Sequence, residues 1–258
     1  MATENELPPF DLRLAMDTLA AKDPHLAPLI QETQEFRVAK GAAESPYEVL
    51  VEAITHQSIS GRAAATIFGR VKDLGSNGRI PTPQEMLRLR KPALRKAGLS
   101  AAKILAMKDL AQKTIDGVVP TLDQARRLSD EELVNRLVSV RGIGPWTVEM
   151  FLIFRLGRPD VLPVHDLGVR KGWAITYGKK RMPAPKELLK FGERWRPYRT
   201  VASWYMWRAC QRAGQAVLRK IRPSKTNNRA RPVPARRNPK NPPRLSPRPK
   251  SRAKRPAG

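Results

Sequence analysis

The sequence predicts an all-α protein, and three features indicate this fold class. Ser45, Thr82 and Ser129 each stand three residues before a Glu, and Thr121 stands three residues before a Gln. This spacing is the capping box that opens an α-helix. Pro takes the first helical position after two of these caps, where its missing N–H would have had no partner anyway. Apolar residues recur at helical spacing between the caps, with neither strand-like alternation nor an internal repeat.

The predicted helices begin at these caps and end at connections marked by Gly or Pro. We expect helices near residues 10–21, 24–32, 46–57, 60–74, 83–89, 91–97, 100–116, 121–127, 129–139, 145–156, 166–177, 185–193 and 197–219. A chain of 258 residues has room for one substantial core built from such helices.

Residues 137–170 are the most informative stretch, and they begin within a helical hairpin at residues 129–156. Leu133 and Leu137 lie on the apolar face of its first helix, and Gly142 and Gly144 form the turn. Glycines let a phosphate approach the outward-pointing N–H groups at the start of the second helix, so the turn is suited to hold a DNA backbone without reading its sequence. An ordinary corner between two helices would explain the glycines equally well, because Gly is common after a helix C-terminus.

A single acid, Asp166, follows the Gly- and Pro-containing segment 157–165. A fixed carboxylate can stabilise positive charge that builds up in a transition state. Asp166 is a candidate for this carboxylate, and it could act either by activating water or by stabilising the cation directly. Helix N-capping is the alternative role, because N-cap preferences also favour Asp.

The hairpin, the Gly/Pro loop and Asp166 together resemble the helix-hairpin-helix, Gly/Pro...Asp DNA glycosylase superfamily, and more narrowly its 3-methyladenine DNA glycosylase II branch. Three further segments resemble that branch: residues 54–64, with Ser58 in place of a usual Gln, residues 96–103, and residues 195–208. The similarity spans roughly residues 10–218. It implies the helix-hairpin-helix DNA glycosylase fold, with two helical lobes, a cleft between them and no N-terminal β domain.

The resemblance implies an enzyme that flips alkylated bases, such as 3-methyladenine or 7-methylguanine, out of double-stranded DNA and excises them in base excision repair, with Asp166 as its catalytic residue. Trp146 stands where bifunctional relatives carry a Schiff-base Lys, so we expect a monofunctional enzyme that leaves the abasic site intact. Trp146, Met150 and Trp207 match the positions that line the base pocket, where an indole face favours a cationic ring. Core packing is the alternative role of each Trp. No partner acid for Asp166 is evident, and a cationic base needs little help to leave.

Other contacts with DNA are also implied by the resemblance. Gly142, Gly144 and Thr147 match positions that bind the DNA backbone. Leu99 and Ala101 are the candidates for the wedge that fills the space left by a flipped base. No cofactor is required.

A structural monovalent cation is the single metal implied, on the backbone carbonyls of Val138, Val140 and Gly142. The chain has one cysteine, Cys210, which excludes an Fe–S cluster, a Cys-based zinc site and an intrachain disulfide.

The C-terminal segment 219–258 differs in composition from residues 1–218, which we expect to form the glycosylase domain. The formal net charge of the chain is +26, and this segment holds 15 Lys and Arg, nine Pro and no acid. Such a segment cannot bury a core and is predicted to be disordered. We expect it to add salt-dependent affinity for DNA, with a nuclear-localisation-like patch or an RNA-binding arm as alternatives.

No apolar run reaches membrane-span length, and the acidic N-terminus lacks a signal peptide. We therefore expect a protein that is not secreted and is located in the cytoplasm with the nucleoid or in the nucleus. We also expect it to be a monomer, and the resemblance implies that it acts on damaged double-stranded DNA. Two alternative functions stay open. One is a glycosylase of the same fold for a deaminated or oxidised base, because Ser58 and Met150 depart from the branch. The other is a non-catalytic DNA-binding protein.

Overall fold

A computed structural model describes residues 10–33 and 45–221, with side chains up to residue 214. Two compact units divide the chain, residues 1–219 and 220–258. The first unit contains every feature discussed below. The predicted basic tail falls almost entirely outside the described residues, so its disorder and its DNA affinity stay predictions.

The described residues are helical and contain no strand, so the all-α prediction is confirmed. The α-helices are α1 (Leu12–Lys22), α2 (Leu26–Glu32), α3 (Pro46–His56), α4 (Gly61–Lys72), α5 (Pro83–Arg88), α6 (Lys91–Ala97), α7 (Ala101–Ile115), α8 (Leu122–Arg127), α9 (Asp130–Leu137), α10 (Pro145–Phe154), α11 (Leu167–Thr176), α12 (Pro185–Gly192) and α13 (Arg199–Ile221), with short 3-10 turns η1 (Ser76–Gly78) and η2 (Glu193–Trp195). None of the helices in the described part of the chain combines the length and apolarity needed to cross a membrane.

The predicted capping boxes set the helix starts. At α3, α5, α8 and α9 the N-cap side chain accepts from a backbone N–H of the first turn, and the Glu or Gln side chain accepts from the N-cap backbone. Each pair satisfies two N–H groups that the helix itself leaves open. Local sequence is therefore enough to fix where these helices begin.

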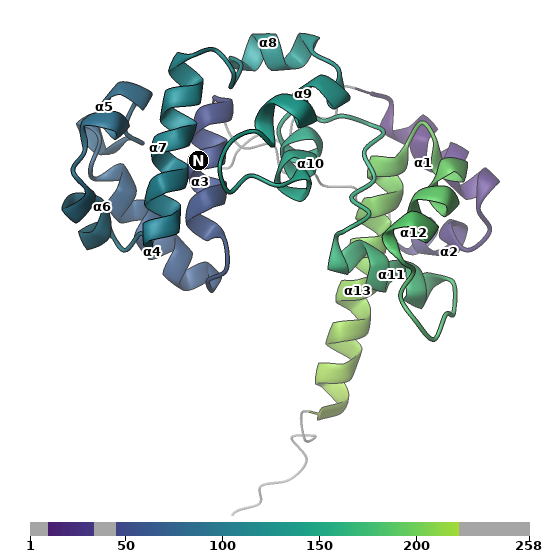
Figure 1. Ribbon diagram of the computed structural model, residues 1–258. Helices are drawn as coiled ribbons and strands as arrows, with labels where there is room; N and C mark the ends of the chain where they lie inside the picture. The colour runs from purple at the N-terminus through teal and green to yellow at the C-terminus, as the bar shows by residue number, and fades with distance from the viewer. Residues whose placement is uncertain (1–9, 34–44, 222–258) are drawn as a thin grey trace, which may run out of the picture. The chain divides into compact units, whose positions relative to one another are not determined.

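The first of two hydrophobic cores is formed by α3 to α10. Its centre includes Leu50, Met107, Leu110 and Phe151, all nearly or fully buried. Helix α7 runs through this group and packs against α3 and α5, as Figure 1 shows. The two arms of the predicted hairpin, α9 and α10, pack against each other.

The second core joins the N-terminal helices α1 and α2 to α11, α12 and α13. Leu19, Val169, Leu188 and Trp195 lie at its centre. In Figure 1, purple α1 and α2 accordingly lie beside the green C-terminal helices. Trp207 of α13 packs against both cores, and the segment from α10 to α11 links them. The site described next lies at this link.

Asp23, directly after α1, ties the N-terminal helices to the second core. Its carboxylate accepts from the Tyr177 hydroxyl at 2.5 Å, the Trp195 indole N–H at 3.1 Å and the His25 backbone N–H at 3.1 Å. Asp23 is almost fully buried, and a buried charge is tolerated only when donors surround it. The same contact raises the pKa of Tyr177, together with the larger effect of burial.

Candidate active site

The turn of the hairpin positions the start of α10. Gly142 has a φ of +80°, a left-handed conformation that glycine adopts without strain. Gly144 is the extended N-cap residue, and Pro145 takes the first helical position, as the sequence predicted. Trp146 follows on the first turn of α10 and is 47% exposed.

Three N–H groups donate to the carboxylate of Asp166. The Trp146 indole N–H reaches Oδ2 at 2.8 Å, and the Trp207 indole N–H reaches Oδ1 at 2.8 Å. The backbone N–H of Val169 also donates to Oδ1 at 2.8 Å, so Asp166 is the N-cap of α11. Capping and a role in the site are therefore compatible, because one carboxylate does both. Side chains from α10 and α13 hold a single acid between the two cores.

Gly168 makes room for this arrangement. A Cβ atom at Gly168 would lie 2.8 Å from Cδ1 of Trp207 and 3.1 Å from Oδ1 of Asp166. Contacts this short would force the indole to move. Trp207 also stacks on Phe154 of α10, with ring centroids 5.7 Å apart. The Trp207 ring is thus fixed on one side by α10 and on the other by the start of α11.

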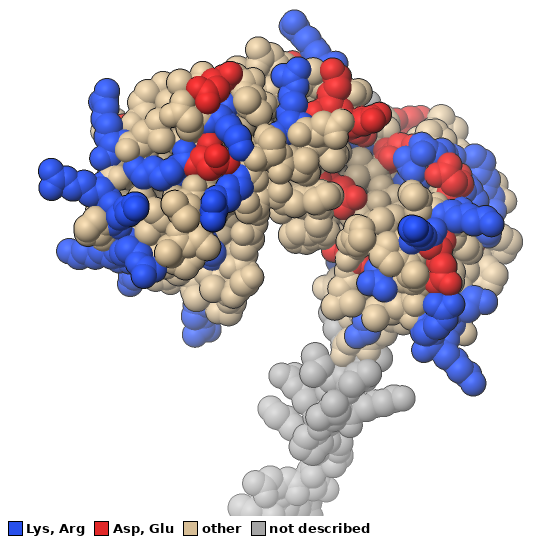
Figure 2. All heavy atoms as spheres, viewed as in Figure 1, with Lys and Arg blue, Asp and Glu red and all other residues tan. Residues whose placement is uncertain are grey.

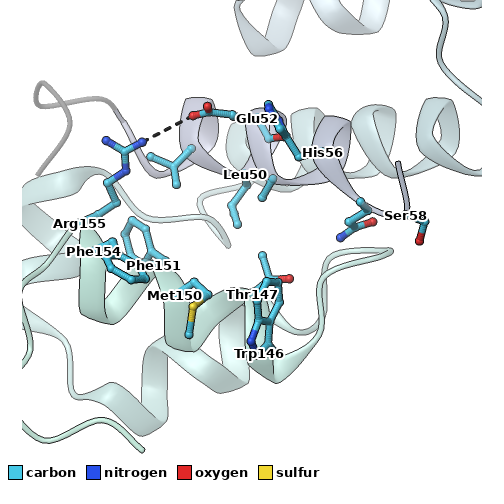
Figure 3. A pocket seen from close by; sticks show the side chains of 13 residues that line it. Leu50, Glu52, His56, Ser58, Trp146, Thr147, Met150, Phe151, Phe154 and Arg155 are labelled. Carbon is cyan, nitrogen blue, oxygen red and sulfur yellow. Dashed lines mark hydrogen bonds and ion pairs between the residues drawn. The ribbon is translucent and has the colours of Figure 1, made fainter. Parts of the chain in front are cut away.

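A cavity of about 520 Å³ opens between α3 and α10. Trp146, Thr147 and Met150 line it from α10, and Glu52 and His56 line it from α3, as labelled in Figure 3. Of the three predicted pocket residues, Trp146 and Met150 therefore line one cavity. Trp207 does not line it and meets them through Asp166 and Phe154 instead. Thr147, predicted to contact the DNA backbone, is 9% exposed and faces this cavity.

The hairpin presents free N–H groups at its turn. Within the described part of the chain, the backbone N–H groups of Gly142, Gly144 and Trp146 make no hydrogen bond. Donors of this kind at a helix N-terminus favour a phosphate. The backbone N–H of Thr147 donates to Gly144 at 3.0 Å, which leaves it engaged within the turn.

Side chains of helix α7 form hydrogen bonds with the backbone of the hairpin. Asp109 accepts from the Arg141 backbone N–H at 2.7 Å and from Lys113 at 3.0 Å, and Lys113 also donates to the Ser139 carbonyl.

Lys and Arg side chains spread over the face of the molecule drawn in Figure 2, with acids between them. On this face, the Lys and Arg side chains of the described residues are spread over several helices and do not form one patch.

The residues of the wedge prediction fare differently. Gly98 is a left-handed helix C-cap, and the Leu99 N–H donates back to the Leu94 carbonyl at 3.2 Å. In this Schellman arrangement the residue after the glycine folds onto the helix, and Leu99 is only 2% exposed. Leu99 is therefore a core residue and is not available as a wedge. Ala101 is exposed but small.

Sequence reasoning passed over an exposed apolar side chain beside the cavity. Ile59 follows the cavity-lining Ser58 in the turn between α3 and α4 and is 39% exposed. Ser58 itself has a φ of +58°, which is uncommon for a residue other than glycine. The signal was present in the sequence, because an Ile stands among polar residues in a turn.

Sequence reasoning also missed a second acid beside Asp166. Glu149 lies on α10, three residues after Trp146, and is half-buried. Burial, and to a lesser extent the negative charge of Asp166, together raise the pKa of Glu149 to about 7. Sequence reasoning found no evident second acid near Asp166, and the structure brings Glu149 close enough for the two charges to interact. Helical spacing alone could have predicted that Glu149 lies on the same side of the helix as Trp146. It could not have predicted that Glu149 is buried.

The predicted cation site consists of backbone carbonyls. The Gly142 carbonyl accepts from the Gln57 side chain at 2.8 Å, and the Val140 carbonyl accepts from the Ile143 N–H at 3.0 Å. A carbonyl oxygen has two lone pairs, so each oxygen keeps one for an ion, and the third carbonyl belongs to Val138. Among the described residues, no group of three or more His, Cys, Asp or Glu side chains is arranged to bind a metal.

Comparison with known proteins agrees with this geometry. Residues 51–197 match the family model of the HhH-GPD superfamily base excision DNA repair proteins. DNA-3-methyladenine glycosylase 1 of Schizosaccharomyces pombe is 41% identical over 182 residues, which cover 70% of this chain and 79% of that protein. The chain belongs to the HhH-GPD superfamily.

Two solved structures of HhH-GPD relatives superpose well. The S. pombe 3-methyladenine DNA glycosylase Mag1, in complex with abasic DNA, has a TM-score of 0.69 at 39% identity and covers 76% of this chain and 95% of its own. A DNA-3-methyladenine glycosidase from Bacillus halodurans has a TM-score of 0.71 at 32% identity, covering 78% and 91%. The HhH-GPD match includes the hairpin, Glu149 and Asp166, whereas Trp207 follows it in sequence.

Proposed function

We propose that this HhH-GPD protein is a monofunctional DNA glycosylase that excises alkylated purines and leaves an abasic site. The observation that carries the proposal is the carboxylate of Asp166, held between the indoles of Trp146 and Trp207 beside the hairpin. The names of its relatives support alkylated bases as the substrate class.

Asp166 supplies the charge that the reaction needs. As the C1′–N bond breaks, the electron pair leaves with the base, and positive charge develops on the sugar. A fixed carboxylate stabilises that charge without reorganising during the reaction. Water then adds to C1′ and loses a proton, which leaves an abasic sugar and the free base.

Trp146 supports the monofunctional assignment. It stands at the position of the lyase Lys, and its indole N–H binds Asp166 at 2.8 Å. An indole cannot form a Schiff base, so no covalent intermediate with the sugar is available at this position. The abasic strand is expected to remain uncut.

The aromatic groups around Asp166 favour a cationic base. Trp146 is exposed enough to meet an incoming ring, and Trp207 stacks on Phe154. An indole face attracts a positively charged ring more than a neutral one. N-methylation makes a purine cationic, so this preference separates damaged from normal bases.

The finer assignments are part of the same proposal. The narrower placement in the 3-methyladenine DNA glycosylase II branch is supported by the sequence segments at residues 54–64, 96–103 and 195–208. We further propose that the protein acts as a monomer on damaged double-stranded DNA, with the nucleoid or in the nucleus. It requires no cofactor, and a monovalent ion on the carbonyls of Val138, Val140 and Gly142 would bridge the hairpin to a phosphate.

Incubation of the protein with methylated duplex DNA tests the proposed function. We expect release of 3-methyladenine or 7-methylguanine, identified by chromatography, and strand breaks that appear only after alkali is added. Release of a deaminated or oxidised base from the corresponding DNA, with no methylated purine, would identify a different lesion. Strand cleavage without alkali would contradict the monofunctional assignment, and DNA binding without release of any base would indicate a non-catalytic protein.

A further inference from the structure

Glu149 and Asp166 place two carboxyl groups in one site. Glu149 and Trp146 are three residues apart on α10, a spacing that puts both side chains on the same side of the helix. The Trp146 indole N–H reaches Asp166 at 2.8 Å, so this side of α10 faces the acid. The negative charge of Asp166 contributes to the raised pKa of Glu149.

One oxygen of Glu149 has no partner. Its Oε2 atom is inaccessible to solvent and makes no hydrogen bond within the described residues. A buried carboxylate oxygen normally has a donor or a positive charge beside it, because desolvation of an unpaired charge is costly. Asp166, by contrast, has three N–H donors. Among the described residues, the Oε2 atom of Glu149 therefore lacks the donor that an ionised carboxylate oxygen normally has.

The surroundings of Glu149 explain its ionisation. Burial is the larger cause and the charge of Asp166, on the segment before α11, is the smaller one, and together they raise its pKa to about 7. No other charged side chain of the described residues contributes to this shift. The ion pair of Glu52 with Arg155, 3.5 Å apart, lies between α3 and the end of α10. Trp207 on α13 is uncharged, and no positive charge of the described residues is among the causes of the Glu149 shift.

We propose that Glu149 is a specificity-determining residue, which exchanges its proton for the positive charge of an alkylated base. This inference rests on the proposed function. A nucleotide whose C1′ lies beside Asp166 brings its base, bonded directly to C1′, next to the neighbouring carboxyl group. A cationic base lets Glu149 ionise by releasing its proton to solvent, and the unpaired oxygen gains a counter-charge. A normal, neutral purine offers no such exchange.

The exchange predicts a pH dependence with a definite sign. Below pH 7 the free protein carries the proton on Glu149, and a cationic base must displace it. Engagement of such a base therefore strengthens as pH rises, by up to about tenfold per pH unit below the pKa. The gain stops once Glu149 is already ionised in the free protein. The proposal assigns this dependence to Glu149, so a variant without an ionisable group at this position should lack it.

Release of 3-methyladenine under single-turnover conditions, at subsaturating protein, tests the proposal between pH 5.5 and 8. The measured quantity is the ratio of the wild-type rate to the Glu149→Gln rate at each pH, which cancels any titration of the DNA. We expect this ratio to rise by up to about tenfold per unit below pH 7 and to level off above it. Glu149→Met, which is similar in size and uncharged, should give the same ratio. Glu187→Gln on the surface of α12 should match the wild type, because the pKa of Glu187 is lowered to about 2 by its hydrogen bond from Arg181.

A flat ratio would overturn the proposal, and a ratio that falls with rising pH would replace it with proton donation by neutral Glu149. No release by the wild type would instead remove the proposed function. Unchanged affinity for duplex containing an abasic site verifies that each variant is folded. A measurement on the wild type alone adds a readout that needs no variant. Binding of duplex with 7-methylguanine on a hydrolysis-resistant 2′-fluoro sugar at pH 6 should release about one proton more than binding of abasic duplex, detected calorimetrically in buffers of different ionisation heat. Equal proton release would contradict the exchange.

Discussion

Asp166→Asn is expected to slow base release by about 10²- to 10³-fold while DNA binding is retained. The Asn side chain keeps one oxygen, which can still accept from the Val169 backbone and the Trp207 indole. Asn is also a good helix N-cap, so α11 should still form. The variant loses only the negative charge and the contact with Trp146. Single-turnover release of 3-methyladenine at saturating protein measures the loss of chemistry apart from binding.

Asp123→Asn is the matched control for this variant. Asp123 lies on the first turn of α8 with its side chain 81% exposed, and its 3.5 Å ion pair with Arg126 is on the surface. Removal of such a pair has little effect on stability, and the ion pair of Asp123 among the described residues is with Arg126 on its own helix. Its rate should equal that of the wild type. Equal rates for Asp166→Asn and the wild type would remove Asp166 from the reaction.

Gly172→Ala is expected to destabilise the fold by about 3 kcal/mol or more. A Cβ atom at Gly172 would lie 1.9 Å from the Met206 carbonyl oxygen and 2.5 Å from its carbon. These are backbone atoms of α13, so the clash cannot be relieved by turning a side chain. Helices α11 and α13 would have to separate. Asp166 is the N-cap residue of α11, and Trp207 lies on α13, so the site would be disturbed as well. Thermal unfolding should shift down by roughly 6–12 °C, and base release should fall with it.

Gly69→Ala provides the comparison for that substitution. Gly69 lies inside α4, and nothing approaches within 4 Å of a Cβ atom placed there. Ala is favoured over Gly in a helix interior by about 1 kcal/mol, so this variant should unfold at a slightly higher temperature. If Gly172→Ala unfolded at the wild-type temperature, the close packing of α11 on α13 would be incorrect.

Local signals explain why the helices and Asp166 were predictable from the sequence. The capping boxes at Ser45, Thr82 and Ser129 act within one helical turn, so no tertiary information is needed to recognise them. The hairpin glycines and the loop before Asp166 are likewise contiguous in sequence. Their meaning as a glycosylase site came from resemblance to a family, because an N-capping Asp alone is common.

The features missed by sequence reasoning depend on tertiary burial. Leu99 was the one bulky residue of its loop, but the left-handed Gly98 turns it into the core. Glu149 is one of several acids on helices, and its altered pKa arises only when folding buries it beside Asp166. Trp207 was predicted to line one pocket with Met150, and in the structure it donates to Asp166 and stacks on Phe154. Such neighbours lie far apart in sequence.

Affinity for a cationic sugar analogue tests most directly whether Asp166 faces the charge that develops at C1′. The two probes are duplexes of one sequence, in which a single abasic position carries either a neutral tetrahydrofuran ring or a protonated pyrrolidine ring. Ligands that resemble a transition state bind more tightly than the ground state, by 10²-fold or more. We predict that the wild type prefers the pyrrolidine duplex by about 100-fold and that Asp166→Asn loses most of this preference. An equal preference in both proteins, or none in the wild type, would contradict the assignment of Asp166. Its proposed role is to stabilise the positive charge that develops on the sugar as the base leaves.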